Sequence, residues 1–458
     1  MQTSGNKRRI IISHLTDIEG NLSYFERWSR RSNHIQFADG RLLFRDSDCH
    51  FVYGGDSCDK GPGDLRLGRT LVDFKQANPD RVTLIAGNRD IKCRRFTYEL
   101  NTMSDRRLLY GAATFWNPDM PPRQYVIRQM QAEQNAANSE TDIKNYVMSL
   151  GIEACQTLYL KWMLHETMGC GSFHNKPTTF EYRRMELAAI AKQSAEEITD
   201  DMVTKSFIDS MMPSGYLNAY LKQAQLAHII GETLFIHGAI NIENMGYVPG
   251  MSDTDARITD AREWIQQLND WYSSQIREWL AVPVEEGLHA PGHKPLDKYV
   301  VCNPKSIVTS NWYQQGQFAP IRKEVIKFLN DAGIYRVISG HQPCSDFPLI
   351  IRDPDLEVIV GDTGYSDPSA ISDNRGKALH NLTLTEQGNA SFVSIDAIRR
   401  DGSNMVLNLP SRAEIKAGKD SAIGHFTPDG RLIRPANASQ LLASQLEGFS
   451  IIDRPFKP

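Results

Sequence analysis

The sequence predicts an α/β fold whose core is interrupted by a long helical insertion. Several short β-branched runs each end at a polar residue beside glycine, which is typical of buried strands in an α/β core. Helical apolar periodicity fills most of the segments between these runs. The stretch from about 100 to 228 has no strand-like run and is rich in Met, Gln, Ala, Arg and Glu. This pattern therefore predicts a helical insertion between two halves of one core.

Six apolar runs are the expected strands of this core. They occupy residues 9–16, 50–55, 81–87, 232–236, 335–340 and 357–361, and the polar residues that follow them are Asp17, Asp56, Asn88, His237, His341 and Asp362. α/β proteins commonly bind ligands at the carboxyl ends of their strands. We therefore expect these polar side chains to meet at one edge of the sheets, with Asp362 as a further candidate for ligation or substrate contact.

Helices are expected between the strands. In the first half they occupy 22–31, after the potential cap Asn21, and 64–77, which Pro79 closes. Inside the insertion we expect helices at 125–135, 141–150, 153–168, 180–193 and 214–229, and beyond it at 255–280 and 321–332. The predicted division is a discontinuous core at 8–100 and 229–400, an insertion at 101–228 that serves as a cap or lid, and a weakly patterned C-terminal tail at 401–458.

Composition excludes several classes of protein. The 458 residues are 41% hydrophobic and carry 51 Lys and Arg against 55 Asp and Glu, so the chain is neither disordered nor globally basic. We therefore expect no nucleic-acid partner. No run approaches the ~20 apolar residues of a membrane helix, so no membrane partner is expected either. The seven cysteines are scattered without a Cys-x-x-Cys pair, which indicates reduced thiols and predicts a cytoplasmic location.

The strand ends supply the ligands of a metal site. Oxygen ligands suit hard cations and imidazoles suit Mn, Fe or Zn. A site with two ions ~3.5–4 Å apart needs one bridging carboxylate, for which Asp56 is the natural candidate. One ion would take Asp17 and Glu19, and the other Asn88, His237 and His341. Each residue alone is explained equally well as a helix cap or a core histidine, and only the ordered set favours metal binding.

Five segments in this order carry a resemblance to a known family. They are Thr16 to Asn21, Gly55 to Pro62, Gly87 to Asp90, His237-Gly238 and Gly340-His341. They resemble the motif series of calcineurin-like metallophosphoesterases, which include serine/threonine phosphoprotein phosphatases and diadenosine tetraphosphate hydrolases. The resemblance spans about 9–95 and 232–365. It implies a β-sandwich of two mixed sheets flanked by helices, with a dinuclear metal site at the strand ends.

The resemblance also implies a role for each matching residue. Asp17 and Asp56 would bind one ion, and Asp56, Asn88, His237 and His341 the other. Asp59 matches the carboxylate that orients the family's catalytic histidine, and Lys60 matches a basic position that contacts the phosphate. The cofactors implied are two divalent ions, with Mn favoured and Fe, Zn or Mg as alternatives. In this family a metal-bridging hydroxide attacks phosphorus in line.

Two residues depart from the family's pattern. Glu19 replaces a metal-binding histidine and favours a harder ion such as Mn or Mg. Arg89 replaces the histidine that protonates the leaving group, and arginine cannot act as an ordinary acid. We expect Arg89 to clamp a phosphate oxygen and to pair with Asp59. The missing proton would come from water or His14, or would not be needed by a substrate with an acidic leaving group.

A basic cluster follows, formed by Arg89, Lys92, Arg94 and Arg95. It either extends the substrate site, with Arg94 as a further phosphate-binding residue, or is a solvated helix face. The function expected is metal-dependent hydrolysis of a phosphate monoester or phosphoanhydride. Its substrate would be a phosphorylated small molecule, a nucleotide or a phosphoprotein. The alternative is a pseudophosphatase that binds metal or a phospho-ligand without efficient turnover.

Overall fold

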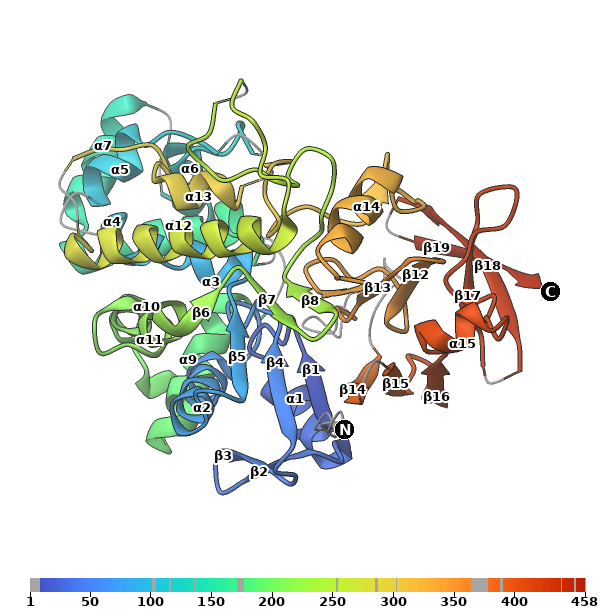
Figure 1. The fold of residues 1–458 in the computed structure, drawn as a ribbon. Coiled ribbons are helices and arrows are strands. Elements are labelled where there is room, and N and C mark those ends of the chain that lie inside the picture. Colours follow the sequence, from blue (N-terminus) through green and yellow to red (C-terminus); the bar gives the residue numbers. More distant parts are fainter. Residues whose placement is uncertain are drawn as a thin grey trace.

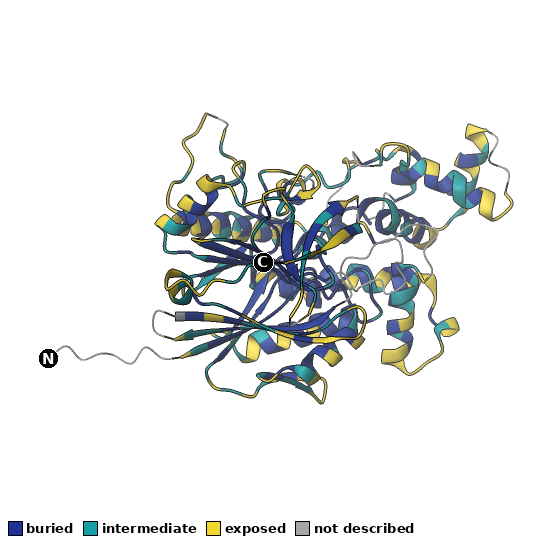
Figure 2. Ribbon diagram, turned by 90° about the vertical axis from the view of Figure 1, so that its right-hand side faces the viewer, coloured by how far each residue is buried: buried dark blue, intermediate teal, exposed yellow. Residues whose placement is uncertain are grey.

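The fold is built around two mixed β-sheets that pack face to face. A computed structural model describes residues 9–100, 104–114, 117–135, 137, 139–170, 177–252, 254–284, 287–301, 303–363, 378–387, 390–437, 439–448 and 450–457. Figure 2 shows the two layers of strands with helices outside them. This confirms the predicted α/β fold of two mixed sheets flanked by helices.

The larger sheet has seven strands. Their order is β16 (Asn404–Leu409), β15 (Ala390–Ile398), β14 (Leu379–Gln387), β1 (Ile10–Leu15), β4 (Cys49–Tyr53), β5 (Val82–Ile85) and β6 (Ala224–Gln225). Strands β1, β4, β5 and β6 run parallel to one another, whereas β14, β15 and β16 add to β1 as an antiparallel half. The first three predicted strands are thus neighbours, and their carboxyl ends lie at one edge of the sheet.

The second sheet has five strands and the same mixed character. Their order is β12 (Leu349–Asp353), β13 (Leu356–Val360), β11 (Arg336–Ser339), β8 (Thr233–Ile236) and β7 (Ala227–Ile230). Strands β8, β11 and β13 are parallel, and β7 and β12 are antiparallel edges. Apolar side chains from both sheets form one buried cluster between the layers. It includes Ile12, Val52, Ile85, Phe235, Ile338 and Ile359.

Helices cover the outer faces of the sheets (Figure 1). On the larger sheet these are α1 (Leu22–Arg31), which contacts β14, and α2 (Asp64–Ala77), which contacts β5. The side chain of Asn21 accepts a hydrogen bond from the Tyr24 amide, so the predicted cap of α1 is confirmed. On the second sheet α12 (Ala261–Ala281) contacts β7, and α14 (Lys323–Asp331) packs on α12. None of the described helices is long and apolar enough to cross a membrane.

The expected insertion is helical along most of its described length. Its elements are α5 (Ser104–Tyr110), α6 (Pro122–Ala132), α7 (Glu140–Ser149), α8 (Ile152–Trp162), a π-helical turn (Met163–Thr167), α9 (Thr179–Ala191), a 3-10 turn (Ala195–Glu197), α10 (Asp200–Met211) and α11 (Tyr216–Gln223). Figure 1 shows α5, α6, α7, α9, α10 and α11 together in the left half of the view. The division of the chain into core, insertion and tail stays a prediction.

Three details of the sequence-based assignment are wrong. The helix expected at 214–229 ends at Gln223, because the following apolar residues form β6 and β7 at the edges of the two sheets. The helix expected from 255 begins at Ala261, because the side chain of Asp260 accepts hydrogen bonds from two amides of its first turn. Helix α10 was not predicted.

The last part of the chain adds regular structure beyond what its weak patterning indicates. Strand β16 completes the larger sheet, and β17 (Leu432–Pro435), β18 (Leu441–Glu447) and β19 (Ser450–Phe456) form a separate antiparallel sheet. The remaining short elements are α3 (Asn88–Lys92), α4 (Arg95–Tyr98), α13 (Pro295–Tyr299), α15 (Arg412–Lys416), β2 (Ile35–Ala38), β3 (Arg41–Phe44), β9 (Tyr313–Gln314) and β10 (Gln317–Phe318).

Candidate metal centre

The predicted ligands lie close together, just after the carboxyl ends of strands from both sheets. Asp17, Asp56 and Asn88 follow the ends of β1, β4 and β5 by two or three residues. His237 and His341 follow β8 and β11 by one and two residues. Because these strands are parallel within each sheet and the sheets are stacked, the five side chains converge from two layers.

Three of these side chains form a group that can hold a metal ion. Ligand atoms of Asp56, His237 and His341 all lie within 4.8 Å of one another. The His237 Nε2 atom lies 3.3 Å from Asp56 Oδ2 and 3.2 Å from Asn88 Oδ1. Its Nδ1 lies 2.8 Å from the Gly54 carbonyl oxygen, the usual outer partner of a metal-binding imidazole. His341 Nδ1 is buried without a hydrogen-bond partner in the described residues. This donor set could hold a metal ion.

Burial and the charges of neighbouring side chains shift the pKa values of these residues. Burial opposes the charge of His237, but the carboxylates of Asp56 and Asp17 outweigh it and raise the pKa of His237 to about 10. Burial, together with the neighbouring His237, lowers the pKa of His341 to about 3. Burial and the charge of Asp362 raise the pKa of Asp17. Asp362 thus lies close to the group, while residues 364 and 365 of its turn are outside the described residues.

The loops at this edge have an unusual backbone. Among the described residues, nine non-glycine residues have positive φ, and five of them belong to the predicted site: Asp17, Glu19, Asp56, Asp59 and His341. Left-handed backbone is costly for residues with a Cβ and tends to persist where function requires it. The loops are also closely packed, because a Cβ added to Gly340 would lie 2.0 Å from Asp17 Oδ2. Glycine is therefore required beside the carboxylates.

Glu19, predicted as a ligand of a second ion, contacts two cations. Its Oε1 lies 2.6 Å from Arg89 Nε, and its Oε2 lies 3.1 Å from Lys60 Nζ. Asp17, the other predicted ligand of that ion, has both carboxylate oxygens within hydrogen-bond distance of the His341 amide. Among the described residues, neither acid joins a group of three potential ligands. In this structure the carboxylate of Glu19 is thus paired with Arg89 and Lys60, and the prediction of a second ion stays a prediction.

Arg89 lies at the centre of a network that reaches the insertion. Its Nη1 donates to Asp59 Oδ1 at 2.7 Å, so the predicted pairing of these two residues is confirmed. Its Nε lies 3.5 Å from Asp56 Oδ2. On the other side it donates to the carbonyl oxygens of Met168 and Gly169, at 3.4 and 3.2 Å. The two residues that follow the π-helical turn thus contact the side chain that lies beside the metal group.

Asp90 organises these loops, and the sequence did not assign it a role. Its carboxylate accepts hydrogen bonds from the backbone amides of Gly87, Asp56 and Ser57 at 2.8–2.9 Å, and from the Ser57 hydroxyl at 2.7 Å. The side chain is fully buried. It therefore ties the loop after β4 to the start of α3. The only signal in the sequence was its place in the third motif.

Arg94, predicted to bind substrate, is not presented to solvent. Its side chain is 1% exposed, and Nη2 lies 2.6 Å from Asp297 Oδ1 of α13. Arg95 is likewise buried and forms a two-pronged ion pair with Glu99. Both interpretations of these two arginines, as an extended phosphate site and as a solvated helix face, are wrong, because α3 and α4 are covered by neighbouring helices.

His14, one of the predicted proton sources, lies inside the core. Its side chain is fully buried, and its ring stacks on Phe235 with centroids 6.0 Å apart. A Cβ added to Gly54 would lie 3.0 Å from its Nε2, which shows how closely the chain covers it. Burial, with a contribution from His380, lowers the pKa of His14 to about 3. A neutral, enclosed imidazole cannot protonate a leaving group, so this prediction is wrong.

The buried imidazoles of His14 and His380 predict an acid-sensitive fold. Burial lowers the pKa of His380 to about 4. In the unfolded chain these two histidines take up protons below pH ~6.5. In the folded chain the same two imidazoles stay neutral. Stability should therefore fall as pH drops from 7.5 to 5, by about 2 kcal/mol for each histidine. Urea denaturation at both pH values checks this. His14→Met should remove about half of this part of the loss, and an unchanged pH dependence in that variant would contradict the prediction.

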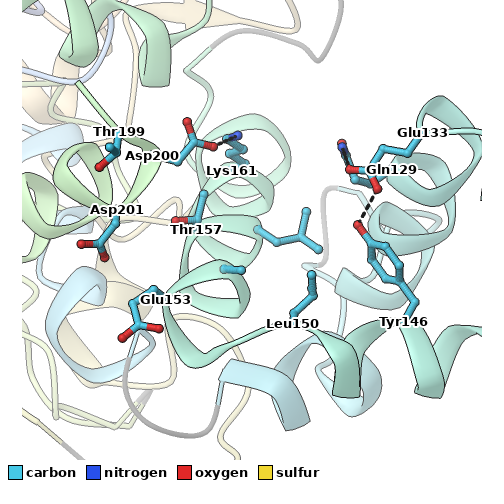
Figure 3. Close-up of a pocket in the computed structure, with 12 residues that line it drawn as sticks. Gln129, Glu133, Tyr146, Leu150, Glu153, Thr157, Lys161, Thr199, Asp200 and Asp201 are labelled. Carbon is cyan, nitrogen blue, oxygen red and sulfur yellow. Dashed lines mark hydrogen bonds and ion pairs between the residues drawn. The ribbon is translucent and has the colours of Figure 1, made fainter. Parts of the chain in front are cut away.

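A cavity lies within the insertion (Figure 3), and none of the site residues described above lines it. It has a volume of about 400 Å³ and lies between α6, α7, α8 and the start of α10. Among the described residues that line it, Lys161 is the only basic one. Its Nζ lies 2.8 Å from Asp200 Oδ2, and Glu133, Glu153 and Asp201 add negative charge. It therefore offers little to attract a phosphate, and the strand-end group remains the candidate site.

Comparison with known proteins shows similarity at the level of structure only. No model of a protein family matches the sequence, and no curated protein sequence matches it. A cold-active protein-tyrosine phosphatase from a Shewanella species is 12% identical, with a TM-score of 0.39, and the match covers 87% of this chain and 80% of that one. A protein serine/threonine phosphatase from Saccharomyces cerevisiae is 8% identical, with a TM-score of 0.33 and coverage of 88% and 83%. These scores are low, so we base the function on the residues of the site.

Proposed function

We propose that this protein is a metal-dependent phosphoesterase that hydrolyses a phosphate monoester or a phosphoanhydride. The observation that carries the proposal is the convergence of Asp56, His237 and His341 from loops of both sheets, with Asn88 beside them. This mixed oxygen and nitrogen set suits Mn, Fe or Zn. The resemblance to calcineurin-like metallophosphoesterases rests on the same residues.

The chain's own groups have distinct tasks in this proposal. Asp56, Asn88, His237 and His341 would hold the ion, which would polarise the phosphoryl group and acidify a water molecule. Arg89, whose Nε lies 3.5 Å from Asp56 Oδ2, and Lys60, which contacts Glu19, would supply positive charge where a phosphate binds. Asp59 keeps Arg89 in position through their hydrogen bond.

The substrate preference follows from what the site lacks. Arg89 stands where the family has its acid, and His14 is enclosed in the core. We therefore propose substrates whose leaving group needs no protonation, such as an aryl phosphate or a phosphoanhydride. A nucleotide, a phosphorylated small molecule and a phosphoprotein are all compatible with this chemistry.

Phosphate release tests the proposal. The substrates are p-nitrophenyl phosphate and a dinucleoside polyphosphate, assayed with added Mn²⁺ and again with a chelator. We expect activity that depends on the metal and falls more than about a hundredfold in Asp56→Asn, because this change removes a ligand itself rather than an outer partner. Asp73→Asn, an exposed acid on α2, is the matched control and should keep full activity. The proposal fails if metal-loaded wild type is no faster than Asp56→Asn.

A pseudophosphatase is the second candidate, and the observation that favours it is arginine at position 89 in place of the acid. It predicts metal binding without turnover on either substrate. Arg89→His separates the two candidates further. A large gain in activity on an unactivated alkyl phosphate would show that the acid was the missing part.

A further inference from the structure

The negative charge of Glu19 is already balanced within the protein. Its two carboxylate oxygens contact different cations, Arg89 at 2.6 Å and Lys60 at 3.1 Å. The Glu19 side chain is 10% exposed and that of Arg89 is 12% exposed, so water screens their contact only in part. An ion ligated by Glu19 would lie about 2.0–2.2 Å from the same oxygens and hence close to both cations. Like charges at that separation repel strongly.

The guanidinium of Arg89 is fixed and is not a mobile substrate clamp. Of its five N–H groups, the one at Nε, both at Nη1 and one at Nη2 contact oxygen atoms of the protein. The partners are Glu19, Asp59 and the carbonyl oxygens of Met168 and Gly169. Its backbone amide also donates to Asp56 Oδ1 at 2.9 Å. A side chain held by acids on one side and by carbonyl oxygens of the insertion on the other keeps its place when a ligand binds.

Arg89 also lies against the carboxylate that would have to bridge two ions. Its Nε is 3.5 Å from Asp56 Oδ2, the atom that lies 3.3 Å from His237 Nε2. Asp56 therefore has an imidazole on one side and a guanidinium on the other. This is the arrangement expected if a permanent cation takes the second position.

We propose that the site binds one divalent ion per chain, through Asp56, His237 and His341, and that Arg89 is a built-in cation in place of a second ion. This inference rests on the metal centre of the proposed function. It specifies a single exchangeable ion rather than the two predicted from the sequence. Lys60 assists by neutralising the other oxygen of Glu19.

Metal stoichiometry tests this inference without relying on activity. The full chain is stripped with a chelator, equilibrated with Mn²⁺ by dialysis and analysed for bound metal. Wild type should bind one ion per chain and give the electron paramagnetic resonance spectrum of an isolated Mn²⁺ rather than of a coupled pair. Glu19→Gln should still bind one ion. Arg89→Met should bind two, because it frees Glu19, and the exposed Arg27→Met on α1 should bind one.

Two ions in wild type, falling to one in Glu19→Gln, would overturn the inference. One ion in a folded Arg89→Met would overturn the role of Arg89. If Arg89→Met does not fold, the measurements on wild type and Glu19→Gln still decide how many ions each chain binds. Two bound ions together with phosphate release would leave the proposed function intact and overturn only this inference. One bound ion without phosphate release would overturn only the proposed function. No bound ion would overturn both the proposed function and this inference.

Discussion

Asp90→Asn is expected to reduce both stability and activity, although Asp90 is not among the predicted ligands. The carboxylate accepts hydrogen bonds from the amides of Gly87, Asp56 and Ser57 and from the Ser57 hydroxyl. An asparagine of the same size turns an NH₂ group toward some of these donors, which leaves buried N–H groups unsatisfied. We expect a loss of at least about 2 kcal/mol in the free energy of unfolding.

The activity of Asp90→Asn should fall because the Asp56 backbone loses its anchor. Changes to outer partners of metal ligands typically cost about 10–100-fold in metal affinity or activity. Urea denaturation and Mn²⁺-dependent phosphate release measure the two effects on the same preparation. The exposed Asp80→Asn is the control and should match wild type in both assays. Wild-type values for Asp90→Asn would show that the loop is held by other contacts.

Asp297→Ala should destabilise the fold by about 3–5 kcal/mol, because it leaves the Arg94 guanidinium buried without a counter-charge. Arg94 Nη2 and Asp297 Oδ1 are 2.6 Å apart, and each side chain is only 1% exposed. The hydroxyl of Tyr98 donates to the same carboxylate and would lose its acceptor as well. The free energy of unfolding in urea at neutral pH measures the effect.

The pair of Lys327 and Asp331 on α14 provides a matched control. It has the same N–O distance, 2.6 Å, but the two side chains are 75% and 60% exposed. Asp331→Ala should therefore change stability by less than about 1 kcal/mol. A similar effect of both substitutions would show that burial of the Arg94 pair does not set its strength.

The positions of the ligand candidates could be predicted because a local pattern encodes them. A short apolar run followed by a polar residue beside glycine marks a strand end, and parallel strands bring such ends together. This holds for Asp56 and His237, which are distant in sequence, although His237 Nε2 lies 3.3 Å from Asp56 Oδ2. The pairing of Asp59 with Arg89 was also foreseeable, because opposite charges in adjacent motifs compensate each other.

Features that depend on long-range packing could not be predicted in this way. Arg94 looks like a surface cation until α13 supplies Asp297, some 200 residues later in the chain. The residues after 223 continue an apolar pattern that suits a helix as well as a strand, and only the free sheet edges select strands β6 and β7. The role of Asp90 arises from backbone amides of two loops, those after β4 and β5, and no side-chain pattern in the sequence marks the direction of these amides.

The left-handed residues of the site have a consequence for selection and engineering. Each non-glycine residue in this conformation costs about 1 kcal/mol or more. At Asp17, Glu19, Asp56, Asp59 and His341 the same residue supplies a polar side chain that glycine cannot replace. A screen for heat tolerance alone would favour glycine at these positions and would eliminate the proposed chemistry. Selection for thermal stability and selection for turnover therefore act in opposite directions on these five codons.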